Sequence, residues 1–140
     1  GKTDVVQMLN GCIGGLVAIT AEPLMPSPLA AILIGAVGGI IVVYGTKLLF
    51  SLQIDDVVGA VPAHLFAGIW GTLIVPATNV DASFSAQLIG VVSVNAFVFI
   101  VSYIIWSIMK VSIGLRLSKE GETKGTDVTE TGVIAYAIRD

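Results

Sequence analysis

The sequence has little charge and very few side chains that carry out chemistry. Only 12% of its 140 residues are Asp, Glu, Lys or Arg, against roughly 25% in soluble domains. It contains one histidine, His64, and one cysteine, Cys12, so no disulfide framework and no cluster of metal ligands is expected. There is no G-x-S-x-G nucleophile motif, and no basic cluster that would bind nucleic acid. These absences argue against an enzyme, a metal or cofactor protein, and a nucleic-acid-binding protein.

Apolar residues are in excess instead, at 55% of the chain. They gather in four segments, at about 5–21, 28–49, 57–76 and 86–109, each close to the ~20 residues that a membrane-crossing helix needs. From residue 114 the composition becomes charged and rich in Gly and Thr. We therefore predict an all-α, polytopic membrane fold with a transmembrane region over residues 1–113 and a tail in water over residues 114–140.

The basic residues predict an orientation. With four spans, all seven Lys and Arg residues fall on one side of the membrane, and the other two connections have none. Basic loops face the cytoplasm. We expect a multi-pass protein of the cell (plasma) membrane with both ends of this chain cytoplasmic. The basic residues are Lys2, Lys47, Lys110, Arg116, Lys119, Lys124 and Arg139.

His64 is the leading candidate for a functional side chain. It lies in a run from Val57 to Pro76 that contains no Lys, Arg, Asp or Glu, and a helix there would place it about 4 Å from the middle of the bilayer. An ionisable ring at that depth is a functional candidate by default. The alternative is a packed histidine that bonds to a backbone carbonyl.

Small residues surround His64 at helical spacing. Ala60, Gly68 and Thr72 share its row, and a second row of small residues adjoins it. Either a neighbouring helix packs there or a narrow path runs past the ring. Asp55 and Asp56 precede this segment, where carboxylates cap helices; attraction of cations is the alternative.

Small residues also recur in the first two segments. Gly11 and Gly15 are four apart, as are Gly14 and Ala18, and the second segment repeats this spacing at Ala31, Gly35 and Gly39. This spacing predicts close contact between helices. In the last segment, Asn95 is expected to bond across to another helix.

Three stretches, "GCIGGLVAIT", "IDDVVGAVPAHLFAGIWGTL" and "GLRLSKEGETKGTDVTETGVIAYA", resemble successive signatures of the ammonium transporter family (Amt/Mep/Rh), in the same order and at the same spacing. Members of that family are homotrimers of eleven-helix subunits, each with its own pore. The resemblance implies that this chain is the C-terminal portion of such a subunit, its last four helices plus the cytoplasmic tail. The absence of an initiator Met at Gly1 fits a fragment.

The resemblance also implies roles for residues. His64 is similar to the second of the family's paired pore histidines, whose partner belongs to helices outside this chain. Their position before the helix and the four-residue spacing, and not the resemblance, make Asp55, Asp56, Ala60, Gly68 and Thr72 candidates to cap or support this helix. The tail would pack beneath a neighbouring subunit, and a P-II signal protein docks on that face in many relatives. The tail residues that match the family are Gly125, Asp127, Glu130, Gly132, Ala135 and Tyr136.

Two other functions stay open from the residues alone. A structural subunit of a larger membrane complex needs only the small-residue rows and an interhelical Asn. A sensor of ammonium on the same scaffold would keep the pore and depend on the tail. Replacement of His64 separates the first from a transporter, and replacement of Tyr136 or deletion of residues 117–140 separates the second.

Overall fold

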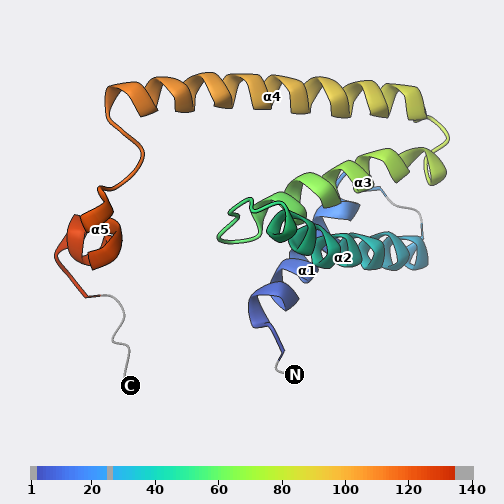
Figure 1. Cartoon of the computed structure of the whole chain (residues 1–140). Coiled ribbons are helices and arrows are strands. Elements are labelled where there is room, and N and C mark those ends of the chain that lie inside the picture. Colours follow the sequence, from blue (N-terminus) through green and yellow to red (C-terminus); the bar gives the residue numbers. More distant parts are fainter. Residues whose placement is uncertain (1–2, 25–26, 135–140) are drawn as a thin grey trace. The chain divides into compact units, whose positions relative to one another are not determined.

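The computed structural model describes residues 3–24 and 27–134, and the regular structure in that part is entirely helical. The expected all-α class is confirmed there. The helices, most of which are labelled in Figure 1, are α1 (Val5–Ile19), α2 (Pro28–Ser51), η1 (Val61–Phe66), α3 (Ala67–Ile74), η2 (Val75–Ala77), α4 (Phe84–Ser112), α5 (Lys119–Lys124) and η3 (Asp127–Thr131). Segments η1 and η3 are π-helical and η2 is a 3-10 turn.

Helix length separates two of the four apolar segments from the others. In the described part, α2 with 24 residues and α4 with 29 are long and apolar enough to cross a membrane. The other two apolar helices, Val5–Ile19 and Val61–Ala77, are shorter. At 1.5 Å per residue they extend about 22 and 25 Å, against a hydrocarbon layer of about 30 Å. That all four segments span the membrane stays a prediction.

Local side chains decide where several helices begin. Asp4 accepts a hydrogen bond from the Gln7 amide at 3.0 Å at the start of α1. Ser27 accepts one from Ala30 at 3.4 Å, just before Pro28 opens α2. Free amides at a helix start need such acceptors, and proline suits the first position because it has no N–H to satisfy. These starts therefore follow from nearby sequence.

The core of the first compact unit, residues 1–96, lies where α1, α2 and the helix formed by η1 and α3 pack together (Figure 1). Its fully buried side chains are small: Val42 is 0% exposed, Ala63 1% and Ala67 0%. A Cβ added to Gly71 would lie 2.3 Å from the Ala18 carbonyl oxygen. Here backbones approach each other so closely that no side chain fits between them.

Gly14 and Gly15 of α1 face α2 at similarly short range. A Cβ on Gly15 would lie 3.1 Å from the Gly35 carbonyl oxygen, and one on Gly35 would lie 3.3 Å from that of Gly15. A Cβ on Gly38 would lie 2.7 Å from the Gly14 carbonyl oxygen. The close contact that the four-residue spacing predicts is confirmed.

Two polar bonds tie the same unit together. The Trp70 indole donates to the Ile34 carbonyl at 3.1 Å, which links α3 to α2. The Asn79 amide donates to a carboxylate oxygen of Glu22 at 2.8 Å, which links the connections after η2 and α1. Glu22 is only 8% exposed, so this bond supplies a partner for a buried carboxylate.

The second compact unit, residues 97–140, contains the end of α4 and the tail. In it α5 and η3 pack against each other. Ser118 caps α5 by accepting from the Gly121 amide at 3.1 Å, and the Thr129 hydroxyl donates to the Gly121 carbonyl at 3.2 Å. Within its described residues, the tail therefore forms a small helical hairpin.

We expect Gly71→Ala to destabilise the protein, because the added methyl would meet the Ala18 carbonyl, a backbone atom that cannot move alone. Overpacking of this kind costs about 1–3 kcal/mol. Gly11→Ala is the control, since an added Cβ there meets no atom within 4 Å. Thermal unfolding of both variants in one detergent measures the difference, and an equal loss in both would contradict the packing described.

Candidate functional site

The small residues around His64 form two rows that face different surroundings. The row of Ala63, Ala67 and Gly71 is buried against α1 and α2. The row of His64, Gly68 and Thr72 is turned away from that core, with His64 exposed and the other two half-buried. Packing is therefore confirmed for the row of Ala63, Ala67 and Gly71. That a path runs past the row of His64 stays a prediction.

His64, Gly68 and Thr72 line the same hollow, of about 380 Å³. Ala60 lies at the start of the same row but does not line it. Within the described part of the chain, the His64 ring takes part in no hydrogen bond. Within residues 3–24 and 27–134, His64 is therefore not bonded to a backbone carbonyl, which was the alternative to a functional role. The lining residues are His64, Leu65, Gly68, Ile69, Thr72, Gly90, Val91, Val94 and Asn95.

Asn95 is the polar residue that α4 contributes to this hollow. Its amide donates to the Val91 carbonyl at 2.8 Å, four residues back on the same helix. The prediction that Asn95 bonds to another helix is wrong within the described residues. Its amide bonds to a carbonyl of its own helix, which lies within reach.

The helix around His64 is wound as a π-helix. The Ala67 amide donates to the carbonyls of Pro62 and His64, and the first of these bonds spans five residues. Pro62 and Phe66 pack over Gly45 of α2, where an added Cβ would lie 2.9 Å from the proline ring and 2.6 Å from the phenylalanine ring. Short π-helical segments are frequent at functional sites.

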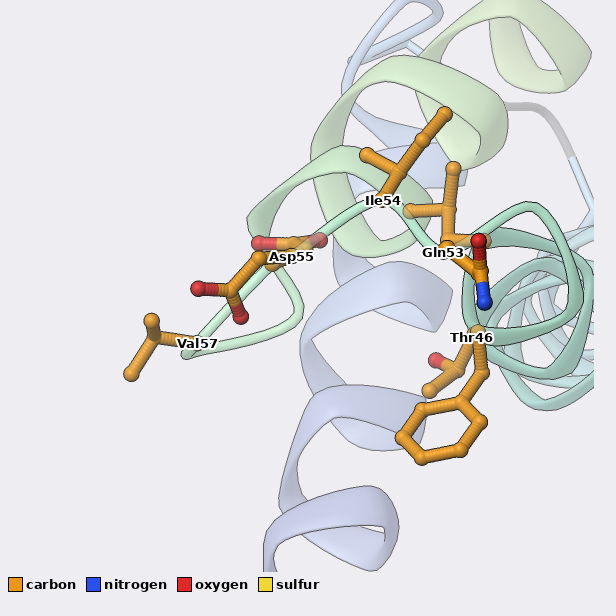
Figure 2. Close-up of a pocket in the computed structure, with 8 residues that line it drawn as sticks. Thr46, Gln53, Ile54, Asp55 and Val57 are labelled. Carbon is orange, nitrogen blue, oxygen red and sulfur yellow. The ribbon is translucent and has the colours of Figure 1, made fainter.

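The structure separates the roles of the two aspartates. Asp56 accepts hydrogen bonds from the amides of Ala60 and Val61, both at 2.9 Å, which is the geometry of a helix cap. Asp55 makes no hydrogen bond among the described residues and lies on a second hollow, of about 550 Å³. Figure 2 shows Thr46, Gln53 and Asp55 around it. His64 does not line this hollow.

The helix begins at Val61, later than the expected 57, since Gly59 has a φ of 71°. Asn10 of α1, a residue that sequence reasoning did not single out, holds the preceding loop. Its amide donates to the Val58 carbonyl at 2.7 Å. The only signal in the sequence is a polar amide inside an apolar segment.

The tail residues lie in the other compact unit. Gly125 ends α5 with a φ of 100°, and Gly132 ends η3 with a φ of 69°. Both values favour glycine. Asp127 begins η3, and Glu130 is exposed on it. Ala135 and Tyr136 lie outside the described residues.

An ion pair stabilises the start of the tail. Both carboxylate oxygens of Glu122 accept hydrogen bonds from Arg116. The hydrogen bond from Arg116 lowers the pKa of Glu122 below its ordinary 4.5, and the same bond raises the pKa of Arg116. Because both side chains are exposed, the pair is screened by solvent and contributes little to stability.

The sequence is similar to that of known membrane proteins over almost its whole length. A model of the Ammonium Transporter Family matches residues 1–136. The chain is 42% identical over 133 residues to the protein sll1017 of Synechocystis, covering 94% of the chain and 30% of that protein. It is 36% identical to the ammonium transporter Amt2 of Archaeoglobus fulgidus, covering 97% and 33%. The chain thus spans about a third of the length of these curated relatives.

The apolar helices and the family match define an α-helical membrane protein of the transport class, not an enzyme. The chain belongs to the ammonium transporter family.

We expect Asp56→Ala to destabilise the start of η1, because two helix-start amides lose their acceptor. Loss of such a cap costs about 1 kcal/mol. Asp55→Ala is the matched control, since it removes a neighbouring carboxylate that makes no hydrogen bond in the described part. Thermal unfolding compares the two variants. A loss as large for Asp55→Ala would show that charge, and not capping, is responsible.

In the tail, we expect the carboxyl carbon of Glu122 to titrate below 4.5 in nuclear magnetic resonance spectra. Since the pKa of Glu122 is lowered in the folded tail, the small stabilisation by the ion pair is fully present above the ordinary pKa of 4.5. It is lost as the pH falls through the lowered pKa. Arg116→Gln should return the titration toward 4.5. An unchanged midpoint in that variant would refute this cause.

Proposed function

We propose that the chain forms the last four membrane spans and the cytoplasmic tail of a transporter that moves ammonium or ammonia across the cell membrane, with His64 lining the pathway. The observation that carries this proposal is His64 itself. Its ring is turned away from the packed core of its own helices and lines a hollow with small and apolar residues. A histidine on an apolar helix without an internal partner is suited to a site that other spans complete.

The chemistry of an imidazole suits ammonium and ammonia. Its two ring nitrogens can donate and accept hydrogen bonds. A narrow, apolar path with such a ring offers hydrogen bonds to a molecule of ammonia. It offers a bare metal cation no oxygen ligands to replace its water. Gly68 and Thr72, in the same row, keep the path open beside the ring.

Orientation and assembly belong to the same proposal. Both ends of the chain face the cytoplasm, as the one-sided Lys and Arg residues favour. The subunit assembles as a homotrimer, and its tail packs beneath a neighbouring subunit, where a P-II signal protein can dock. The helical hairpin of α5 and η3 supports a tail with defined surfaces. Gly125 and Gly132 support it through the backbone turns that they allow.

We expect His64→Ala, made in the complete transporter, to change the rate of methylammonium uptake or the exclusion of potassium, because the pathway loses its hydrogen-bonding ring. A loss of about tenfold in uptake corresponds to a barrier increase of about 1.4 kcal/mol. Uptake is measured in cells that lack other ammonium transporters, and normalised to the amount of protein in the membrane.

Phe97→Ala is the control, since Phe97 is an exposed ring of α4 that lines none of the described hollows. Unchanged uptake and unchanged potassium exclusion in His64→Ala would remove His64 from the pathway and favour a structural subunit. Normal signalling without measurable uptake in the unaltered protein would favour a sensor, and deletion of residues 117–140 should then abolish that signalling.

A further inference from the structure

The loop before the His64 helix carries a backbone carbonyl that the helix itself does not use. Gly59 has a φ of 71°, so helical winding does not extend back through it, and the Ala63 amide donates to the Gly59 carbonyl at 3.2 Å. The Val58 carbonyl lies one residue before that bond, in the turn. It accepts from a donor on another helix.

Asn10 supplies that donor from α1. Its side-chain amide lies 2.7 Å from the Val58 oxygen, 48 residues away in sequence. The fit is close, since a Cβ added to Gly59 would lie 2.3 Å from the same amide nitrogen. Gly59 also has a φ of 71°, which favours glycine. The amide of Asn10 and the turn at Gly59 thus depend on each other.

The loop that Asn10 holds fixes where η1 begins. Asp56 caps the amides of Ala60 and Val61 from within that loop, and the Ala63 amide donates to the Gly59 carbonyl at 3.2 Å. His64 follows one residue later. A shift of the helix start by one residue would move the ring by about 1.5 Å along the axis and turn it by about 100°. It would then leave the row that lines the hollow.

We propose that Asn10 is a positioning residue for His64: by donating to the Val58 carbonyl in the loop before the helix, it sets the height and the rotation of the imidazole. This inference rests on the proposed role of His64 in the pathway. Asn10 itself does not line the hollow beside His64. Its effect reaches the pathway through the backbone of residues 58–64.

The test uses the complete transporter and four variants: Asn10→Ala, His64→Ala, the double variant of both, and Gln7→Ala. We expect Asn10→Ala to lower the maximal rate of methylammonium uptake about fivefold, with a smaller change in the half-saturating concentration. Gln7→Ala is the matched control, because Gln7 is a side-chain amide on the same helix whose Nε2 has no partner among the described residues. It should transport normally.

The double variant separates positioning from general stability. If Asn10 acts on transport through the position of the imidazole, its loss should matter less once that ring is absent. We expect the loss from Asn10→Ala to be smaller in the His64→Ala background than in the unaltered protein, a coupling that a double-mutant cycle measures. Equal losses in both backgrounds would overturn the inference.

Other outcomes are equally decisive. Asn10→Ala with unaltered uptake, while His64→Ala changes it, would overturn the positioning role and leave the proposed function standing. His64→Ala without effect would overturn the proposed function first. If Asn10→Ala does not accumulate in membranes, Asn10→Asp, which keeps the size and loses the donor, takes its place. Failure of both to assemble, with Gln7→Ala assembling normally, would assign Asn10 a structural role only.

Discussion

The close approach of α1 to its two neighbours is the contact on which the rest of the structure depends. The Ala18 carbonyl lies so near Gly71 that no side chain fits between α1 and α3, and Gly14 and Gly38 bring α1 and α2 together in the same way. Because apolar side chains gain little by leaving lipid for protein, such packing of backbones stabilises membrane helices better than large side chains do. The row of Ala63, Ala67 and Gly71 is buried in this contact, so the adjoining row with His64 faces outward.

Hydrogen bonds and a turn at the start of η1 then set the position of the His64 ring within this outward row. Asn10 donates to the Val58 carbonyl, Gly59 allows the turn, and Asp56 caps the first amides. The bonds of Asn10 and Asp56 give backbone groups of this loop and helix start defined partners. The π-helical winding of η1 follows at once, with His64 inside it. The bonds of Asn10 and Asp56 and the turn at Gly59 thus lie within a few residues of His64.

Much of the surface of the described residues is apolar. None of the apolar residues of the long helix α4 is buried within the chain. Large exposed apolar surfaces mark contact with lipid or with other protein. The relatives are about three times as long as the chain, so a longer polypeptide of this family has further residues that could cover these faces. The proposed pathway beside His64 would need such residues to complete it.

The sequence by itself determined the helical class, the four apolar segments, the close contacts at four-residue spacing and the family, because each depends on residues near one another in the chain. Hydropathy, helix caps such as Asp4 and Ser27, and glycine spacing are all local signals. Only the tertiary structure decided which small row turns inward, since the two rows differ by about 100° of rotation and are almost equal in composition. It also decided the bonds of Asn10 to Val58 and of Asn79 to Glu22, which join residues 48 and 57 positions apart. A sequence pattern carries no record of such pairs, because they form only when packing brings distant segments together.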